Sequence, residues 1–349
     1  MVNALKKFIL NNWEEHLPEL GKPADLSALI MGSSQYWLPY LKSLVLFFRP
    51  GDDHPVFVGK MSEDPHFFCI TEREYENIQR MHDGSFPKPA TCAIPKPVSL
   101  QKIGKDTVML QTGVSGTPMR TVITRSHSKE SIRTEMLRTA FDSSLAWLTE
   151  IYSSKIERGG SSAQEVEHLM STLLGYYAEL YSPEGEEKQA VEGAWDTVKP
   201  LLQRDLPLVP LHGDFWIDNI FVEDGRVSGV IDWEYARPLF LPLFDWFQFQ
   251  FSAATAVSSR MDFATIFQNA FLSKNETTAE FAGTLPEYCG AVGMDCDPKL
   301  VEALFILWIV ETSVRERELF GKSYASDMLR HANLGALLER SETAPWKSI

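Results

Sequence analysis

The stretch LVPLHGDFWIDNIFVEDGRVSGVIDWE, residues 208–234, decides the fold and carries the most informative side chains of the chain. An apolar approach leads to His212-Gly213-Asp214, and after a gap comes Asn219. Two apolar runs then flank Asp224-Gly225, a β-hairpin signal because glycine accepts a positive φ at the turn. The second run ends at Asp232. A hairpin returns the chain to its start, so we expect Asp214, Asn219 and Asp232 to converge on one small volume.

These three side chains offer two carboxylates and one amide oxygen. Such hard oxygen ligands are the kind that Mg²⁺ takes together with substrate phosphates. We therefore predict Asn219 and Asp232 as metal ligands, and Asp214 on the preceding loop as a group that could accept a hydroxyl proton. The alternative is a plain surface hairpin, because Asp and Asn are common turn residues.

The pattern His212-Gly213-Asp214-x-x-x-x-Asn219, followed by Ile231-Asp232-Trp233-Glu234, resembles the catalytic centre of the aminoglycoside phosphotransferase and choline kinase family. Its members are small-molecule kinases with a protein-kinase-like fold. Protein kinases carry H-R-D-x-x-x-x-N and D-F-G at the corresponding places. Here Gly213 stands in place of the Arg that reads a phosphorylated activation loop, so regulation by loop phosphorylation is not expected.

The resemblance implies an α+β, bilobal protein-kinase-like fold. A small N-terminal lobe, residues 1–112, would contain an antiparallel sheet, one key helix and the nucleotide site. Residues 113–118 would form the hinge, and the larger, mainly helical lobe, 119–349, would bind the acceptor and carry the catalytic residue. The length of 349 residues itself favours two lobes. Helical periodicity over 129–154, 163–181 and 186–204 also supports this division.

The N-terminal region has its own regular pattern. Apolar spacing predicts an amphipathic helix over 3–18, and β-forming runs predict strands near 26–31, 44–48 and 56–60. Two further runs, 98–101 and 107–111, flank a glycine turn and predict a hairpin. The pattern of residues 71–82 predicts a helix. Thr71 could cap it, because Glu74 follows three residues later, the spacing of a capping box.

The resemblance assigns nucleotide contacts within this lobe. Lys60, at the end of the third strand, would pair with ATP phosphates, and Glu74 would hold Lys60 in place; Glu76 is the second choice for that partner. Glu74 could instead serve only as a capping residue. Ser33 and Ser34 after Gly32 would cover the phosphates with their backbone N–H groups, although this single-glycine segment is equally typical of an ordinary turn.

The hinge would hold the base of the nucleotide. By resemblance, the backbone of Thr112 and Val114 would bind the adenine edge. Because the backbone reads the base, GTP could replace ATP as phosphoryl donor. The expected cofactors are thus Mg²⁺ and ATP, with GTP as an option.

Composition limits the partners and the compartment. A net charge of −14 argues against a general nucleic-acid binder, which needs a basic stripe. Most of the acidic excess lies in the C-terminal part, where it would suit a cationic acceptor or simply aid solubility. The four cysteines show no metal-binding spacing, and no secretory signal or membrane span is visible, so we expect a cytoplasmic monomer or homodimer with no membrane partner.

The resulting hypothesis is a kinase that moves the γ-phosphoryl group of ATP or GTP to a hydroxyl of a small molecule such as an amino alcohol, aminoglycoside or sugar. A kinase-like scaffold without activity and a protein kinase are the alternatives. By resemblance Asp245 would brace the catalytic loop, while Asp218 is expected to be solvated. Residues to search for near the acceptor are Trp216, Glu234, Tyr235, Trp246, Trp308 and Glu311.

Overall fold

The computed structural model describes residues 2–32, 42–62, 68–83, 92–103, 106–125, 130–153, 155–258, 263–320 and 344–348. The chain forms two compact units. The first comprises Met1–Thr117 and Asn219–Ala236, and the second comprises Pro118–Asp218 and Arg237–Ile349. The first crossing between the units falls inside the predicted linker 113–118. The segment 219–236, which the sequence places in the C-terminal lobe, belongs instead to the first unit.

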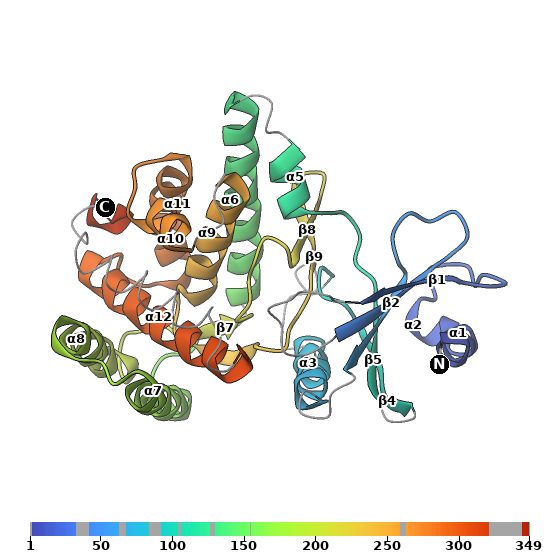
Figure 1. Cartoon of the computed structure of the whole chain (residues 1–349), viewed down its shortest axis with the longest axis horizontal. Coiled ribbons are helices and arrows are strands. Elements are labelled where there is room, and N and C mark those ends of the chain that lie inside the picture. Colours follow the sequence, from blue (N-terminus) through green and yellow to red (C-terminus); the bar gives the residue numbers. More distant parts are fainter. Residues whose placement is uncertain are drawn as a thin grey trace. The chain divides into compact units, whose positions relative to one another are not determined.

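An antiparallel sheet dominates the first unit, in the order β1-β2-β3-β5-β4 (Figure 1). The strands are β1 (Ser27–Gly32), β2 (Lys42–Phe48), β3 (Phe57–Ser62), β4 (Pro97–Ile103) and β5 (Asp106–Thr112). The helices are α1 (Val2–Asn11), α2 (Trp13–His16) and α3 (Phe68–Met81). The five predicted strands are therefore present, which confirms the antiparallel N-terminal sheet.

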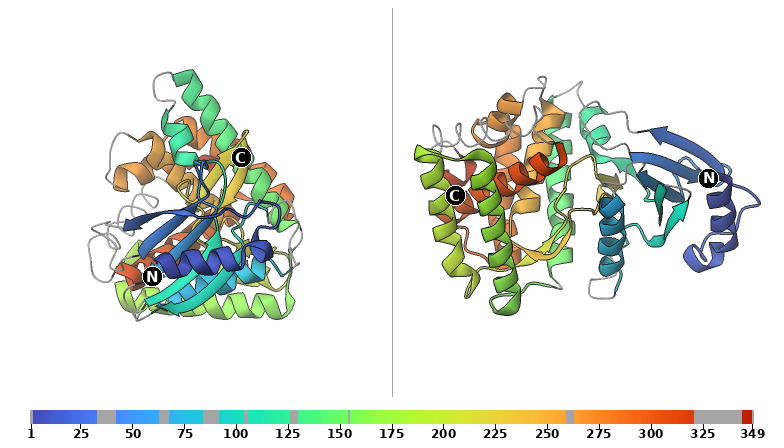
Figure 2. Two further views of the ribbon diagram at one scale, coloured as in Figure 1. Left: turned by 90° about the vertical axis from the view of Figure 1, so that its right-hand side faces the viewer. Right: turned by 60° about the horizontal axis from the view of Figure 1, so that its bottom comes forward.

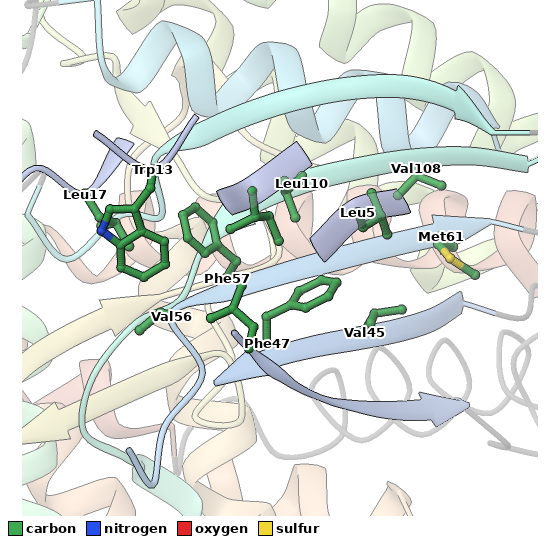
Figure 3. Packing of buried hydrophobic residues seen from close by; sticks show 12 residues of the cluster. Leu5, Trp13, Leu17, Val45, Phe47, Val56, Phe57, Met61, Val108 and Leu110 are labelled. Carbon is green, nitrogen blue, oxygen red and sulfur yellow. The ribbon is translucent and has the colours of Figure 1, made fainter. Parts of the chain in front are cut away.

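The core of this unit lies between one face of the sheet and the two N-terminal helices (Figure 3). Phe57 and Met61 of β3 point into it, and the ring of Trp13 meets that of Phe57 edge-on at 5.7 Å between centroids. Successive strand residues face opposite sides of a sheet. Lys60 is the neighbour of Met61 in β3. It therefore faces away from this core, toward the side where α3 packs.

Two expectations about helices in this unit are wrong. The helix over 3–18 is broken, because α1 ends at Asn11 and a separate turn of helix begins at Trp13. The side chain of Asn12 donates to the Phe8 carbonyl at 2.8 Å, so it satisfies an acceptor at the end of α1 and competes with the continuing helix. The helix predicted over 71–82 begins earlier, at Phe68. Thr71 is therefore a buried residue inside α3 and not its cap.

The hairpin of β8 (Ile220–Glu223) and β9 (Arg226–Val230) is present as predicted, with Asp224 and Gly225 both at positive φ in the turn. The hairpin belongs to the first unit because its strands form hydrogen bonds with other residues of that unit. The Val230 amide donates to the Ala93 carbonyl at 2.8 Å, and the Ser228 hydroxyl donates to the Ser115 carbonyl at 2.8 Å. Sequence periodicity cannot show such long-range bonds.

The second unit is mainly helical (Figures 1 and 2). Its helices are α5 (Met119–Arg125), α6 (Glu130–Tyr152), α7 (Gly160–Tyr181), α8 (Gly185–Leu202), α9 (Phe244–Val257), α10 (Phe263–Phe271), α11 (Glu276–Val292) and α12 (Pro298–Phe320), with the 3₁₀ turn η4 (Pro345–Ser348). A two-stranded ribbon pairs β7 (Val209–Leu211) with β10 (Arg237–Phe240), and the short strand β6 (Thr117–Pro118) spans the unit boundary. The helical prediction for this region is confirmed.

Helix α9 forms the centre of the second unit. Almost all of its residues are buried, which is the pattern of a helix surrounded by others. The ring of Phe247 contacts Phe305 and Trp308 of α12, with centroids 5.0 and 5.9 Å apart. α12 also packs against α7 and α8. The segment that follows β7 joins this aromatic packing, because the ring of Phe215 lies 6.0 Å from that of Phe249 of α9.

No helix among the described residues is long and apolar enough to cross a membrane.

A glycine substitution tests the packing at the end of the sheet. A Cβ at Gly113 would lie 1.8 Å from the Pro55 carbonyl oxygen, so backbone must move. We expect Gly113→Ala to lower the free energy of unfolding by about 1–3 kcal/mol, as overpacking does. Gly193 of α8 has no atom within 4 Å of a built Cβ, so Gly193→Ala should raise stability by about 0.5–1 kcal/mol. Denaturant unfolding measures both; equal effects of the two variants would contradict the packing.

Candidate functional site

The first unit holds a buried lysine between two carboxylates. The Nζ of Lys60 donates to Oε1 of Glu74 and to Oδ1 of Asp232, forming two ion pairs. The Lys60 and Glu74 side chains are only 5% and 1% exposed. A buried ammonium group is tolerated only with such partners, because it has lost its hydration. Glu74, not Glu76, is thus the partner of Lys60; Glu76 pairs on the surface with Arg80.

One face of α3 organises this region. Glu74 and Asn77 are three residues apart, so their side chains share that face. Glu74 binds the strand lysine, while the Nδ2 of Asn77 donates to the Trp233 carbonyl at 2.8 Å. The helix therefore grips both β3 and the segment that follows the β8–β9 hairpin.

The hairpin brings Asn219 next to Asp232 in the way that the sequence predicts. The Ile231 amide donates to the Asn219 main-chain carbonyl at 2.9 Å. Asp232 itself has a φ of 66°, a left-handed conformation that is unfavourable for a residue with a side chain. Strain of this kind often occurs at functional sites, where the surroundings hold a residue in place.

A third carboxylate adds to this cluster. Glu74, Asp232 and Glu234 each offer an oxygen atom, and these atoms all lie within 4.8 Å of one another. With the Lys60 ammonium, the formal charge of the group is −2. Hard carboxylate oxygens with excess negative charge fit a divalent cation such as Mg²⁺. The sequence reasoning looked for Glu234 near an acceptor and missed it here, although its Asp-x-Glu spacing was visible.

The structure says less about the residues predicted to hold the base and to cover the phosphates. The Thr112 amide donates to the Lys96 carbonyl at 3.0 Å, so only its carbonyl remains for a ligand. The Val114 side chain packs against Gly229. Ser33 and Ser34 lie outside the described residues, which stop at Gly32 on this side.

The second unit holds the loop His212-Gly213-Asp214 by its backbone. Asp245, in the first turn of α9, accepts the His212 amide at 2.7 Å and the Gly213 amide at 2.8 Å. It thus braces this loop as expected. Burial raises the pKa of the Asp245 carboxyl to about 7, although the two amide bonds and the nearby Arg315 guanidinium act in the opposite direction. Gly213 has a φ of 81°, a conformation that glycine adopts readily.

Other acidic and aromatic residues of the second unit have structural partners. Asp218 is half exposed and forms a two-pronged ion pair with Arg120, at 2.6 and 2.8 Å. Glu311 pairs with Arg237 at 3.3 Å. Trp246 is fully buried and stacks on Phe249, so it is a core residue. Tyr235 belongs to the first unit.

A cavity lies within the second unit. One of its wall residues, Trp216, follows Asp214 by two positions in the sequence. The free volume of the cavity is about 10 Å³, room for about one water molecule and far below the size of a small-molecule pocket. Its walls are Trp216, Gln248, Phe251, Trp308, Ile309, Thr312, Ser313 and Glu316. Of the residues proposed from the sequence as acceptor contacts, Trp216 and Trp308 are here.

Two polar atoms in the cavity wall stand out. Thr312 Oγ1 and Glu316 Oε2 are buried, and neither has a hydrogen-bond partner among the described residues. Buried polar atoms normally have a partner, so these two atoms are suited to an ordered water molecule in the cavity. Burial raises the pKa of the Glu316 carboxyl to about 8; the Arg315 guanidinium lowers it, and the Asp214 and Glu311 carboxylates raise it.

The sequence reasoning missed Thr312 and Glu316. A signal existed, because Trp308, Thr312 and Glu316 follow one another at four-residue spacing and so share one face of α12. The spacing did not stand out because the sequence of α12 has the apolar pattern of an ordinary buried helix.

The raised pKa of Glu316 predicts how stability depends on pH. The folded-state value lies above the usual 4.5, so the folded state retains a proton that the unfolded state loses. This contribution is complete below about pH 4.5 and declines as the pH rises toward about 8. Glu316→Gln cannot ionise, so its melting temperature minus that of the native protein should increase by several degrees from pH 5 to pH 8.5. A constant difference across that range would contradict the prediction.

The comparisons with known proteins agree with this geometry. The phosphotransferase enzyme family (APH) matches residues 71–245, just over half of the chain. The matched stretch includes Glu74, Asp214, Asn219 and Asp232. No curated protein matches.

Solved structures show the same fold. A thermostable mutant of aminoglycoside phosphotransferase APH(4)-Ia, in ternary complex with AMP-PNP and hygromycin B, is 14% identical, with 96% of this chain and 98% of that chain covered and a TM-score of 0.53. A mutant of the same enzyme in ternary complex with ADP and hygromycin B is 13% identical, with the same coverage of both chains and a TM-score of 0.52. From its matched motifs and its α+β fold, the chain belongs to the phosphotransferase enzyme family.

Proposed function

We propose that this phosphotransferase is a small-molecule kinase, which transfers the γ-phosphoryl group of ATP to a hydroxyl group of a small polar acceptor. The observation that carries the proposal is the buried Lys60, held between Glu74 and Asp232 in the first unit. A second set of residues supports it, because the second unit presents Asp214 on a loop braced by Asp245. Phosphoryl transfer requires positioning and charge neutralisation more than covalent help from the protein.

The first unit supplies the donor side. Lys60 neutralises phosphate charge, and Glu74 prevents the ammonium group from turning away. Asn219 and Asp232 would hold Mg²⁺, and Glu234 is close enough to join them. When bound, Mg²⁺ would neutralise the charge that develops on the phosphates. The backbone of Thr112 and Val114 would hold the base, which permits GTP as well as ATP, and Ser33 and Ser34 would cover the phosphates.

The second unit supplies the acceptor side. Asp214 orients the acceptor hydroxyl and takes its proton. The cavity beside Trp216 is too small for part of the acceptor, and it would hold an ordered water molecule that pairs with Thr312 and Glu316. The acidic excess of the C-terminal part suits a cationic acceptor such as an amino alcohol, an aminoglycoside or an amino sugar.

A thermal-shift titration with ATP and with GTP, each with and without Mg²⁺, tests the donor side. A ligand at a hundred times its dissociation constant stabilises the folded protein by about 2.7 kcal/mol. Stabilisation that requires Mg²⁺ supports the proposal, and an additional shift from one member of an acceptor panel identifies the acceptor class. If no nucleotide shifts the transition, the kinase proposal is wrong and a scaffold without activity becomes the better explanation.

Asp214 is the first residue to change. Asp214→Asn removes the proton acceptor but keeps the side-chain size, so kcat should fall by about 10²–10⁴-fold while nucleotide binding remains. Asp224→Asn is the matched control. Asp224 is exposed in the hairpin turn at a φ of 51°, a conformation that asparagine also tolerates, so this variant should keep native activity. An active Asp214→Asn protein would rule out the assigned role.

The metal assignment has a separate test. Asp232→Ala removes one proposed ligand and one partner of Lys60, so the Mg²⁺-dependent part of the ATP-induced thermal shift should disappear. Isothermal titration of ATP with and without Mg²⁺ should then give the same affinity for the variant. Asp218→Ala, which breaks only the ion pair with Arg120, should retain the Mg²⁺ effect. A full Mg²⁺ effect in Asp232→Ala would refute the ligand assignment.

A further inference from the structure

The loop His212-Gly213-Asp214 is held from two helices. Asp245 of α9 accepts its amide protons, as described above. On the other side, Nη1 of Arg315 in α12 donates to the Gly213 carbonyl oxygen. Both polar backbone groups of Gly213 therefore have a side-chain partner, one acidic and one basic.

The peptide unit between Gly213 and Asp214 is fixed at both of its ends. Arg315 holds its carbonyl oxygen, and the Asp214 amide donates to Nδ1 of His212 at 3.2 Å. A peptide unit is planar, so fixing its oxygen and its N–H group fixes the plane and the position of the next Cα atom. That atom is the Cα of Asp214, from which the carboxylate projects.

Backbone freedom makes this support necessary. Gly213, at a φ of 81°, can adopt several conformations of nearly equal energy, and a rotation there would redirect Asp214. Asp245 restrains the amide side of Gly213 only. Of the described contacts, the bond from Arg315 is the one that restrains its carbonyl side.

We infer that Arg315 is a positioning residue, which sets the direction of the Asp214 carboxylate by holding the Gly213–Asp214 peptide plane. This inference rests on the proposed role of Asp214 in phosphoryl transfer. Arg315 acts through main-chain atoms, so it should influence the turnover step and leave nucleotide affinity unchanged. Its neighbour Glu316 lines the small cavity beside Trp216, so one turn of α12 contacts both the catalytic loop and this cavity.

The chemistry of the guanidinium group suits this position. It is planar and carries several N–H donors in fixed directions, so it can hold a carbonyl oxygen while it remains beside the acids of the same region. Its positive charge lowers the pKa of both Asp245 and Glu316. A lysine at the same place would keep the charge but present a mobile point donor, so Arg315→Lys should be only a partial substitute.

A matched control lies two residues away. The guanidinium of Arg317 is 6.0 Å from the centre of the Tyr181 ring, against the α7 side of the same helix. Removing either arginine deletes one positive charge from α12. Of these two arginines, only Arg315 bonds to the catalytic loop among the described contacts. The pair therefore separates an effect on Asp214 from a general weakening of α12.

The experiment compares Arg315→Ala, Arg315→Lys and Arg317→Ala in the full-length protein. Hydrolysis of Mg·ATP, with water as acceptor, measures turnover without a known acceptor. We expect kcat to fall about 10- to 100-fold in Arg315→Ala with KM for ATP within about twofold, the size of loss that a small misplacement causes. Arg315→Lys should recover part of the loss, added ethylguanidinium should partly restore Arg315→Ala, and Arg317→Ala should match the native protein.

Hydrogen–deuterium exchange of a peptide covering 209–216 is measured in the same proteins. Faster exchange in Arg315→Ala than in Arg317→Ala supports the bond to the loop even if no phosphoryl transfer is found, so a failure of the kinase proposal would remain distinguishable. Unchanged kcat in Arg315→Ala would overturn the inference, as would equal losses in Arg315→Ala and Arg317→Ala. In the absence of turnover, equal exchange in the two variants would overturn it.

Discussion

The first unit depends on the pairing of one buried ammonium group. Lys60 is almost completely removed from solvent, and an isolated charge in such a place would cost several kcal/mol. Its two carboxylate partners come from α3 and from the segment after β9, so the charge is stable only when three parts of the chain are assembled. The same pairing leaves an excess of negative charge beside Asp232, which prepares the region for a divalent cation.

A second constraint operates in the other unit. Side chains from α9 and α12 hold the loop that carries Asp214 through its main-chain atoms. The Asp245 carboxyl, with a pKa near 7, is strongly desolvated, and it retains its position because it accepts two amide protons close to the Arg315 guanidinium. The His212-Gly213-Asp214 loop is thus placed by charged side chains from two helices of this unit.

Much of this arrangement could be predicted from local patterns. The β8–β9 hairpin follows from Asp-Gly between apolar runs, and it brings Asn219 beside Asp232 by simple return of the chain. Strand alternation explains why Lys60 lies on the face opposite the core. The contribution of Arg315 could not be predicted, because it depends on how α12 packs against elements that precede it by many residues. The four-residue spacing of Thr312 and Glu316 was visible in the sequence, but which face of α12 lines a cavity depends on the same packing. The start of α3 at Phe68 and the break at Asn12 were missed because short polar bonds and tertiary packing outweigh helical periodicity.

The assignment of residues 219–236 to the first unit has a consequence for biosynthesis. A ribosome releases the chain from its N-terminus, so the strands of the main sheet emerge long before the hairpin that bonds to Ala93 and the segment after it that bonds to Asn77. Until then Lys60 lacks one of its carboxylates, and the site cannot be completed. The first part of the second unit, Pro118–Asp218, is synthesised in this interval. The nascent N-terminal part must therefore wait, incompletely paired, while about a hundred residues of another unit are made, and a truncated chain that ends at the linker could not form the donor side of the site.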